Sequence, residues 1–196
     1  MSGTRIFIGI LAFFVFILIK PYKRLVMLRN RIGDAFAQID VQLKQRYDLI
    51  FNLVEIARGY MVHERTTLEE LANARNAAQT ATQAAAQNPA DATALTAMAQ
   101  AEGALSGTLG RFFAIAETYP DLKANQNMMQ LSAELTTTGN EVAFSWQAFN
   151  ESVTDFNSEA QSFPAVLFAK ILGFHRAAQL QPLEAEAGRK APLIQL

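Results

Sequence analysis

The feature that most restricts the fold is a long seam of apolar residues spaced alternately three and four positions apart. It begins at Leu25 and continues to Ala72 with few interruptions. This spacing returns to the same face of a helix on every turn, so it predicts helix and not strand. Gly33 and Gly59 fall inside the seam, but a glycine costs only about 1 kcal/mol in a helix interior. The spacing therefore predicts one helix that reaches about Gln87 and needs partner helices to bury its stripe.

Two further helices are predicted to return along this first one. Pro89 interrupts the Ala-rich stretch 77–101 and ends the first helix. Asp91 or Asn88 can cap a second helix, which runs to Pro120. A third begins within residues 121–125, where Asn125 can serve as a cap, and ends before Pro164. Its seam carries four large aromatic side chains for which we predict core packing, namely Trp146, Phe149, Phe156 and Phe163. A short apolar helix over 165–172 and a tail complete the chain.

An uncharged run, residues 6–19, precedes the seam. At 1.5 Å per residue it spans roughly 21 Å, less than the ~30 Å hydrocarbon core, and runs of this size also occur in cleaved signal peptides. No cleavage motif of small residues follows it, and Arg5 and Lys20 can extend the span by snorkelling. We therefore predict an uncleaved signal-anchor helix and disfavour a buried helix of a soluble core. The residues assigned to this anchor are Ile6, Phe7, Ile10, Phe13, Phe14, Phe16, Ile19 and Lys20.

Basic residues are more frequent after the apolar run than before it. Arg5 precedes the run, whereas Lys20, Lys23, Arg24, Arg29 and Arg31 follow it. This distribution predicts a single-pass protein of the bacterial plasma (inner) membrane with a cytoplasmic body and an N-terminal stub outside. The expected fold is all-α: a transmembrane helix continues into an antiparallel bundle of three long helices plus a short C-terminal helix. The expected divisions are an anchor and basic flank (1–24), the bundle (25–174) and a tail (175–196).

Composition excludes several classes of function. The net charge of −1 offers no field for nucleic acid, so no nucleic-acid partner is expected. Cysteine is absent, and the two histidines, His63 and His175, leave little material for a metal site or for histidine-based catalysis. The chain has no P-loop, dinucleotide-binding or nucleophile-elbow motif. We therefore expect no enzyme activity, no cofactor, no metal and no small-molecule substrate.

The stretch 40–48 concentrates charged and polar side chains on the first helix. Asp40 and Lys44 are four residues apart, as in an ordinary surface ion pair. Arg46 and Tyr47 are expected to face the turn near residues 119–125, where Asp121 offers a carboxylate. The predicted interhelical polar network comprises Asp40, Arg46, Tyr47, Asp48, Asp121, Lys123 and Asn125. A ligand or peptide site near it remains the alternative. Asn150 and Asn157, each beside a seam aromatic, are expected to fix helix register through interhelical hydrogen bonds.

Several motifs resemble the LemA family over residues 25–174. They are Arg29-Asn30-Arg31, IDVQLKQRYDLIFNLV (39–54), Gly59-Tyr60, His63-Glu64, ETYPDLKAN (117–125), Leu131, Glu134-Leu135-Thr136, Phe149-Asn150, Phe156-Asn157, Phe163-Pro164 and Gly173-Phe174. The sequence departs from the usual family pattern at Phe51, Gly139 and Ser145-Trp146. The resemblance implies an N-terminal membrane anchor, a long-helix bundle and no established enzymatic activity.

These features together predict a membrane-anchored helical scaffold or adaptor that acts through self-association or recruitment of a protein partner. Its expected partners are the lipid bilayer, further copies of the chain and an unknown protein. Homo-oligomers are expected because the Ala-rich stretch presents small, flat helix faces. The alternative is an accessory or regulatory subunit of a membrane enzyme or transporter, acting through the C-terminal PLIQL sequence or the YPDLKAN turn.

Overall fold

The fold is all-helical over the part of the chain that the structure describes. A computed structural model describes the backbone of residues 2–181 and the side chains of residues 19–181. Its elements are α1 (Ser2–Arg58), α2 (Arg65–Gln87), α3 (Ala92–Ala116), α4 (Pro120–Lys123), α5 (Gln126–Gln161) and the 3-10 helix η1 (Ala165–Leu167). The predicted all-α class is confirmed for these residues.

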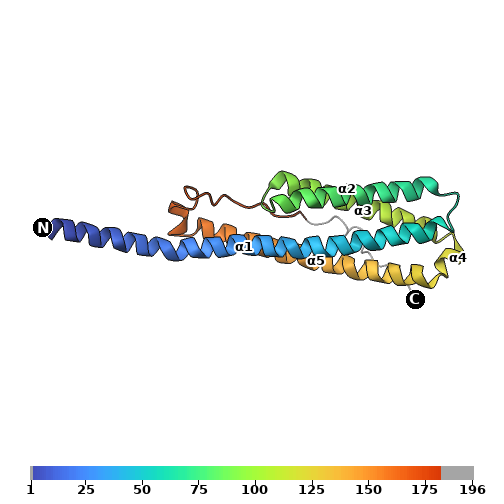
Figure 1. Ribbon diagram of the computed structural model, residues 1–196, viewed down its shortest axis with the longest axis horizontal. Helices are drawn as coiled ribbons and strands as arrows, with labels where there is room; N and C mark the ends of the chain where they lie inside the picture. Colours follow the sequence, from blue (N-terminus) through green and yellow to red (C-terminus); the bar gives the residue numbers. More distant parts are fainter. Residues whose placement is uncertain (1, 182–196) are drawn as a thin grey trace, which may run out of the picture.

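The four long helices form an up-down-up-down bundle (Figure 1). Short connections place α2 beside α1 and α3 beside α2 in opposite directions, and α5 returns along α1. Helices α1 and α5 form the most extensive pair, α2 and α3 form a hairpin, and α2 also packs on α1. The N-terminal part of α1 projects beyond the bundle at the end where α5 finishes (Figure 1).

The prediction of a single helix from residue 25 to about residue 87 is wrong, because the chain turns back at Gly59. The amides of Tyr60 and Met61 both donate to the carbonyl of Ala57, at 3.0 and 2.8 Å, and close the end of α1. Met61 is fully buried in this turn. The reversal lays α2 against α1, which buries the α2 stripe that begins at Leu68. Burial of this stripe decides the structure, since one glycine costs a helix too little to end it. The bundle thus has four long helices and not three.

The later helix boundaries follow the predicted breakers and caps. Helix α2 ends at Gln87, before Pro89, and the Asp91 carboxylate accepts from the Ala94 amide at 2.7 Å to cap α3. Asn125 caps α5 in the same way, accepting from the Met128 amide at 3.1 Å. Each side chain satisfies an amide that the first helical turn leaves without a partner.

The aromatic seam of α5 lies in the core over most of its length. Phe149 is fully buried and meets Phe36 of α1 edge to face, with ring centroids 6.0 Å apart, and Trp146 and Phe156 are also buried. The prediction is wrong at Phe163, which is 81% exposed because α5 ends at Gln161. The predicted helix over 165–172 is also wrong. Only η1 forms there, followed by turns to Gly173.

The predicted anchor falls mostly outside the described side chains. Of its residues only Ile19 and Lys20 are included, and both are exposed; Ile6, Phe7, Ile10, Phe13, Phe14 and Phe16 lie outside. Within residues 19–181, no helix has the length and apolar character needed to cross a bilayer.

Candidate functional site

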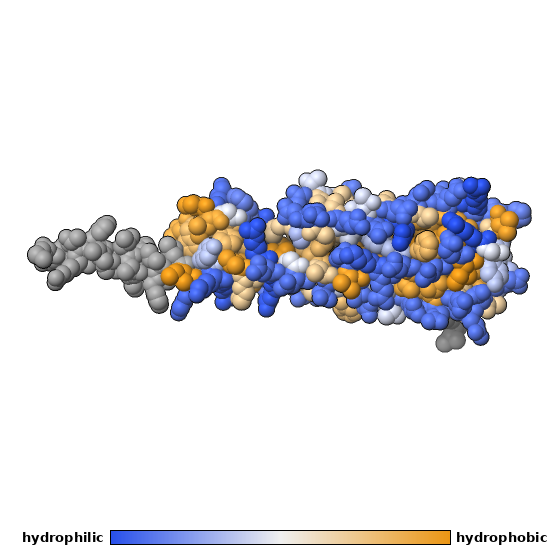
Figure 2. Space-filling model, in the orientation of Figure 1, coloured by the Kyte–Doolittle hydropathy of each residue, from blue (hydrophilic) through white to orange (hydrophobic). Residues whose placement is uncertain are grey.

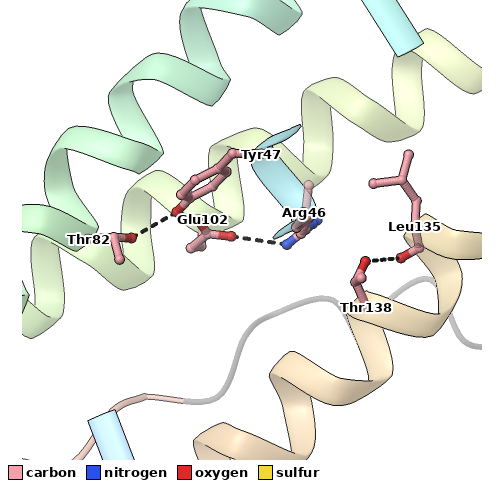
Figure 3. A network of polar contacts seen from close by, with 7 residues as sticks. Arg46, Tyr47, Thr82, Glu102, Leu135 and Thr138 are labelled. Carbon is pink, nitrogen blue, oxygen red and sulfur yellow. Dashed lines mark hydrogen bonds and ion pairs between the residues drawn. The ribbon is translucent and has the colours of Figure 1, made fainter. Parts of the chain in front are cut away.

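A buried ion pair joins α1 to α3 in the middle of the bundle. Arg46 donates from Nη1 to Oε2 of Glu102 at 3.0 Å and from Nη2 to Oγ of Ser106 at 3.0 Å. Figure 3 shows this ion pair between the two helices. The Glu102 side chain is fully buried, and that of Arg46 is 10% exposed. Removing either partner would leave a charge in the core without compensation, which typically costs about 3–5 kcal/mol.

Tyr47 connects the same carboxylate to α2. Its hydroxyl donates to Oε1 of Glu102 and accepts from Oγ1 of Thr82, 2.8 Å away (Figure 3). Burial, together with the neighbouring negative charge of Glu102, raises the pKa of the Tyr47 phenol, so it stays protonated at neutral pH. One carboxylate therefore holds α1, α2 and α3 in register through five residues, which we call the buried network: Arg46, Tyr47, Thr82, Glu102 and Ser106.

The buried network is closed to molecules from solution. Tyr47, Thr82 and Glu102 each have at most 1% of their surface exposed. Burial raises the pKa of the Glu102 carboxyl, while the charge of Arg46 and the hydrogen bond from Tyr47 act in the opposite direction. A raised carboxyl pKa often marks an acid catalyst, but such a group must reach its substrate. This geometry instead suits specification of helix register.

The prediction that Arg46 and Tyr47 face the 119–125 turn is wrong, because they point into the core toward Glu102. That turn packs on the α1–α2 connection, where Nδ2 of Asn125 donates to the Tyr60 hydroxyl at 3.0 Å. Asp121 and Lys123 lie in α4 at this end of the bundle.

Asp40 and Asp48 also lie outside the buried network. Asp40 pairs with Lys44 one turn along α1, at 2.6 Å. Asp48 lies 3.7 Å from Arg75 of α2 and is mostly exposed.

Sequence reasoning missed Glu102, although its position carries a signal. The buried residues Leu95, Met98, Leu105 and Leu109 mark the seam of α3, and Glu102 occupies the seam position between Met98 and Leu105. A single carboxylate at a core position requires a buried cation or donors from another helix. Arg46 and Tyr47 are such groups, but spacing alone does not reveal which helices meet.

Two asparagines of α5 hold the C-terminal segment, defined here as residues 174–181, along the bundle. Asn157 donates to the carbonyl of Ala177 and accepts from its amide, both at 2.9 Å. Asn150 makes the same pair of bonds with Leu180, at 2.9 and 2.8 Å. Seven helical residues and three extended residues each span about 10 Å, so the spacings match. We call this pair the asparagine clamp. The expectation of interhelical bonds is wrong, because both partners are backbone groups of a non-helical segment.

A cleft of about 790 Å³ lies between α1, the α2–α3 turn and the C-terminal segment. Arg29, Asp91, Asn157, His175 and Arg176 are among the residues that line it. Across the turn, the Ala178 amide donates to the carbonyl of Ala90 at 3.4 Å. In the described part of the chain, no three acidic or histidine side chains come together as a metal site would require.

Comparison with known proteins places these features in a family. The family model for the LemA family matches residues 35–196, which include the buried network and the asparagine clamp. The chain belongs to the LemA family. Protein LemA of Metamycoplasma hominis is 25% identical over 180 residues, which cover 92% of this chain and 78% of that protein. The resemblance inferred from the sequence motifs is thus confirmed. In this LemA-family protein, the motif Arg46-Tyr47-Asp48 supplies Arg46 and Tyr47 to the buried network. The motifs Phe149-Asn150 and Phe156-Asn157 supply the two residues of the asparagine clamp.

Proposed function

We propose that the protein is a membrane-anchored helical scaffold or adaptor that acts through self-association or partner recruitment and performs no catalysis. The observation that carries this proposal is the continuity of α1, which is a single helix from Ser2 to Arg58. It includes the apolar run 6–19 and becomes the first helix of the bundle, so one continuous helix joins anchor and bundle. Its 57 residues correspond to about 85 Å.

The anchor places the bundle at the inner membrane. Residues 6–19 cross the bilayer once, and Lys20, Lys23 and Arg24 remain on the cytoplasmic side with the body. A short N-terminal stub lies outside. The exposure of Ile19 and Lys20 is compatible with a lipid boundary at this point on α1.

The bundle offers surfaces for protein contacts. Its best candidate acid, Glu102, is sealed in the buried network and stabilises the helices instead of meeting substrate. Large apolar side chains are exposed along the long helices, including Met27, Val41 and Phe51 on α1 and Met129 and Phe144 on α5, each more than half exposed. Exposed apolar residues outside the core are typical of protein interaction sites when they gather into patches.

The size of the full-length protein in a mild detergent tests this proposal. Light scattering after gel filtration is expected to show a discrete oligomer whose symmetry electron microscopy then defines. Phe144→Asp should shift the particle toward the monomer, since this side chain is 72% exposed, while the matched control Gln147→Asp on the same helix should not.

The same preparation separates the possible roles. A protein partner recovered by a monomeric chain favours the adaptor or accessory-subunit form of the proposal. A strictly monomeric chain that recovers no partner from membranes contradicts it.

A further inference from the structure

The loop that follows α5 exposes an unusual density of large apolar side chains. Within ten residues, five such side chains are about half exposed or more, namely Phe163, Val166, Leu167, Ile171 and Leu172. Phe163 and Ile171 reach 81% and 84% exposure. Apolar surface appears at this end of the bundle in Figure 2. We call these five residues the end patch.

The end patch is held in place by its own buried side. Ala165, Ala169 and Phe174 point into the bundle and are nearly inaccessible to solvent. The Phe174 amide donates to the carbonyl of Ala169 at 2.9 Å, and Gly173 adopts a φ of 80° that favours glycine and lets the chain reverse there. The loop is thus held by Ala165, Ala169 and Phe174 on its inner side, while the five larger apolar side chains of the end patch face outward.

The end patch lies beside the point where α1 leaves the bundle. Arg24 of α1 pairs with Glu159 near the end of α5 at 2.8 Å, and the rings of Tyr22 and Phe174 meet edge to face with centroids 5.8 Å apart. Helix η1 also contacts α1 directly. In Figure 1 the loop occupies the same end of the bundle as the projecting part of α1.

The charges around the end patch complement an anionic surface. Residues 163–173 contain Lys170 and no acidic residue, and the neighbouring turn of α1 adds Lys20 and Lys23. The nearest carboxylate along the chain, Glu159, is already paired with Arg24. Exposed apolar side chains among lysines match the boundary between anionic headgroups and acyl chains.

We propose that the end patch is a second membrane contact, which inserts into the interface of an anionic bilayer beside the anchor. Peripheral elements of this kind sit about 5–10 Å into the headgroup and acyl boundary. This inference rests on the proposed membrane anchoring and adds a site to it. The bundle is then attached at two adjacent places, which fixes its tilt relative to the bilayer.

Single cysteines carrying a nitroxide test the insertion. The chain has no cysteine of its own, so every label reports one position. Leu167→Cys and Ile171→Cys probe the end patch, and the matched controls are Val62→Cys at the opposite end and Phe144→Cys on the side of the bundle, which are 70% and 72% exposed. Full-length protein is reconstituted in vesicles of phosphatidylcholine and phosphatidylglycerol.

The expected result is that both end-patch labels collide more with oxygen than with a water-soluble nickel chelate, while both control labels show the reverse. In vesicles of phosphatidylcholine alone, the end-patch labels should lie at a shallower depth. Water-like collision rates at Leu167 and Ile171 would overturn the inference. Low collision rates with both oxygen and the nickel chelate would also overturn it, because a protein that covers this surface would give that result.

Flotation of the same samples separates this inference from the anchor. If the protein floats with vesicles after an alkaline carbonate wash but its end-patch labels show water-like collision rates, the second contact is overturned and the anchor stands. If the wash removes the protein but its end-patch labels collide more with oxygen than with the nickel chelate before the wash, the anchor is contradicted and the end patch is supported. Protein that never floats contradicts both.

Discussion

Asn157 binds both backbone polar groups of Ala177, donating to its carbonyl and accepting from its amide at 2.9 Å. A side-chain amide used in this way replaces the partner that a neighbouring strand would supply. Because Ala177 is buried, its amide and carbonyl have no ready access to water. The asparagine clamp therefore keeps a non-helical segment in contact with a helical bundle.

Replacing Asn157 by alanine should release the centre of the C-terminal segment. The change leaves two buried backbone groups without partners, a cost of about 1–3 kcal/mol, or roughly 5- to 150-fold faster exchange of the Ala177 amide. Hydrogen exchange measured by mass spectrometry checks this. The control Gln147→Ala removes an exposed contact on the same helix and should leave residues 174–181 protected. Equal protection in both variants would contradict the clamp.

Removing one side of the buried ion pair should destabilise the bundle strongly. Glu102→Ala leaves Arg46 charged inside the core, which is expected to cost about 3–5 kcal/mol. The double variant Arg46→Met with Glu102→Leu should cost much less, because it removes both charges. The exposed pair Arg111–Glu70, 2.9 Å apart, also joins α2 to α3 and supplies the control: Glu70→Ala should cost less than about 1 kcal/mol. Thermal unfolding in detergent measures all three.

The raised pKa of Glu102 predicts a specific pH dependence of stability. Between its ordinary value of 4.5 and its raised value in the fold, the folded state holds this proton more tightly than the unfolded state. The contribution of Glu102 to stability is therefore complete below about pH 4.5 and decreases as the pH rises through the folded pKa. Wild type should lose stability relative to Glu102→Gln over this window. A constant difference between the two unfolding midpoints across the window would show that the pKa is not raised.

Two phenylalanines of the same seam should respond in opposite ways to truncation. Phe149→Ala empties a fully buried position against Phe36 and should cost about 3–5 kcal/mol. Phe163→Ala removes an exposed ring and should change the unfolding free energy by less than about 0.5 kcal/mol. Chemical denaturation of both variants provides the comparison, and similar losses would place Phe163 back in the core.

Local signals predicted the helices better than their ends or their partners. Asp91 and Asn125 could be assigned as caps because a cap needs only the chain next to it. The turn at Gly59 depends on the burial of α2 against α1, which is a property of the whole bundle. The same holds for Phe163, whose spacing fits the seam but whose helix ends two residues earlier.

The candidate site was predicted in part for the same reason. The polar character of Arg46 and Tyr47 was visible in the sequence, but their shared partner Glu102 lies 55 residues or more away on α3. Spacing within a helix defines a face and gives no information on which other helix covers it. Asn150 and Asn157 were recognised as a repeat, but their partners are backbone groups of residues 177 and 180. Backbone partners cannot be inferred from a pattern of side chains.

The pairing of α1 with α5 also sets an order of events during synthesis. The chain leaves the ribosome with α1 first, and about 100 more residues must follow before α5 is complete, which takes roughly 5–20 s at ordinary translation rates. Once Ala116 has been added, and until α5 follows, the α2–α3 hairpin is available to cover part of the apolar stripe of α1. Early docking of this hairpin through Glu102 would shield the newborn helix from aggregation until its final partner emerges.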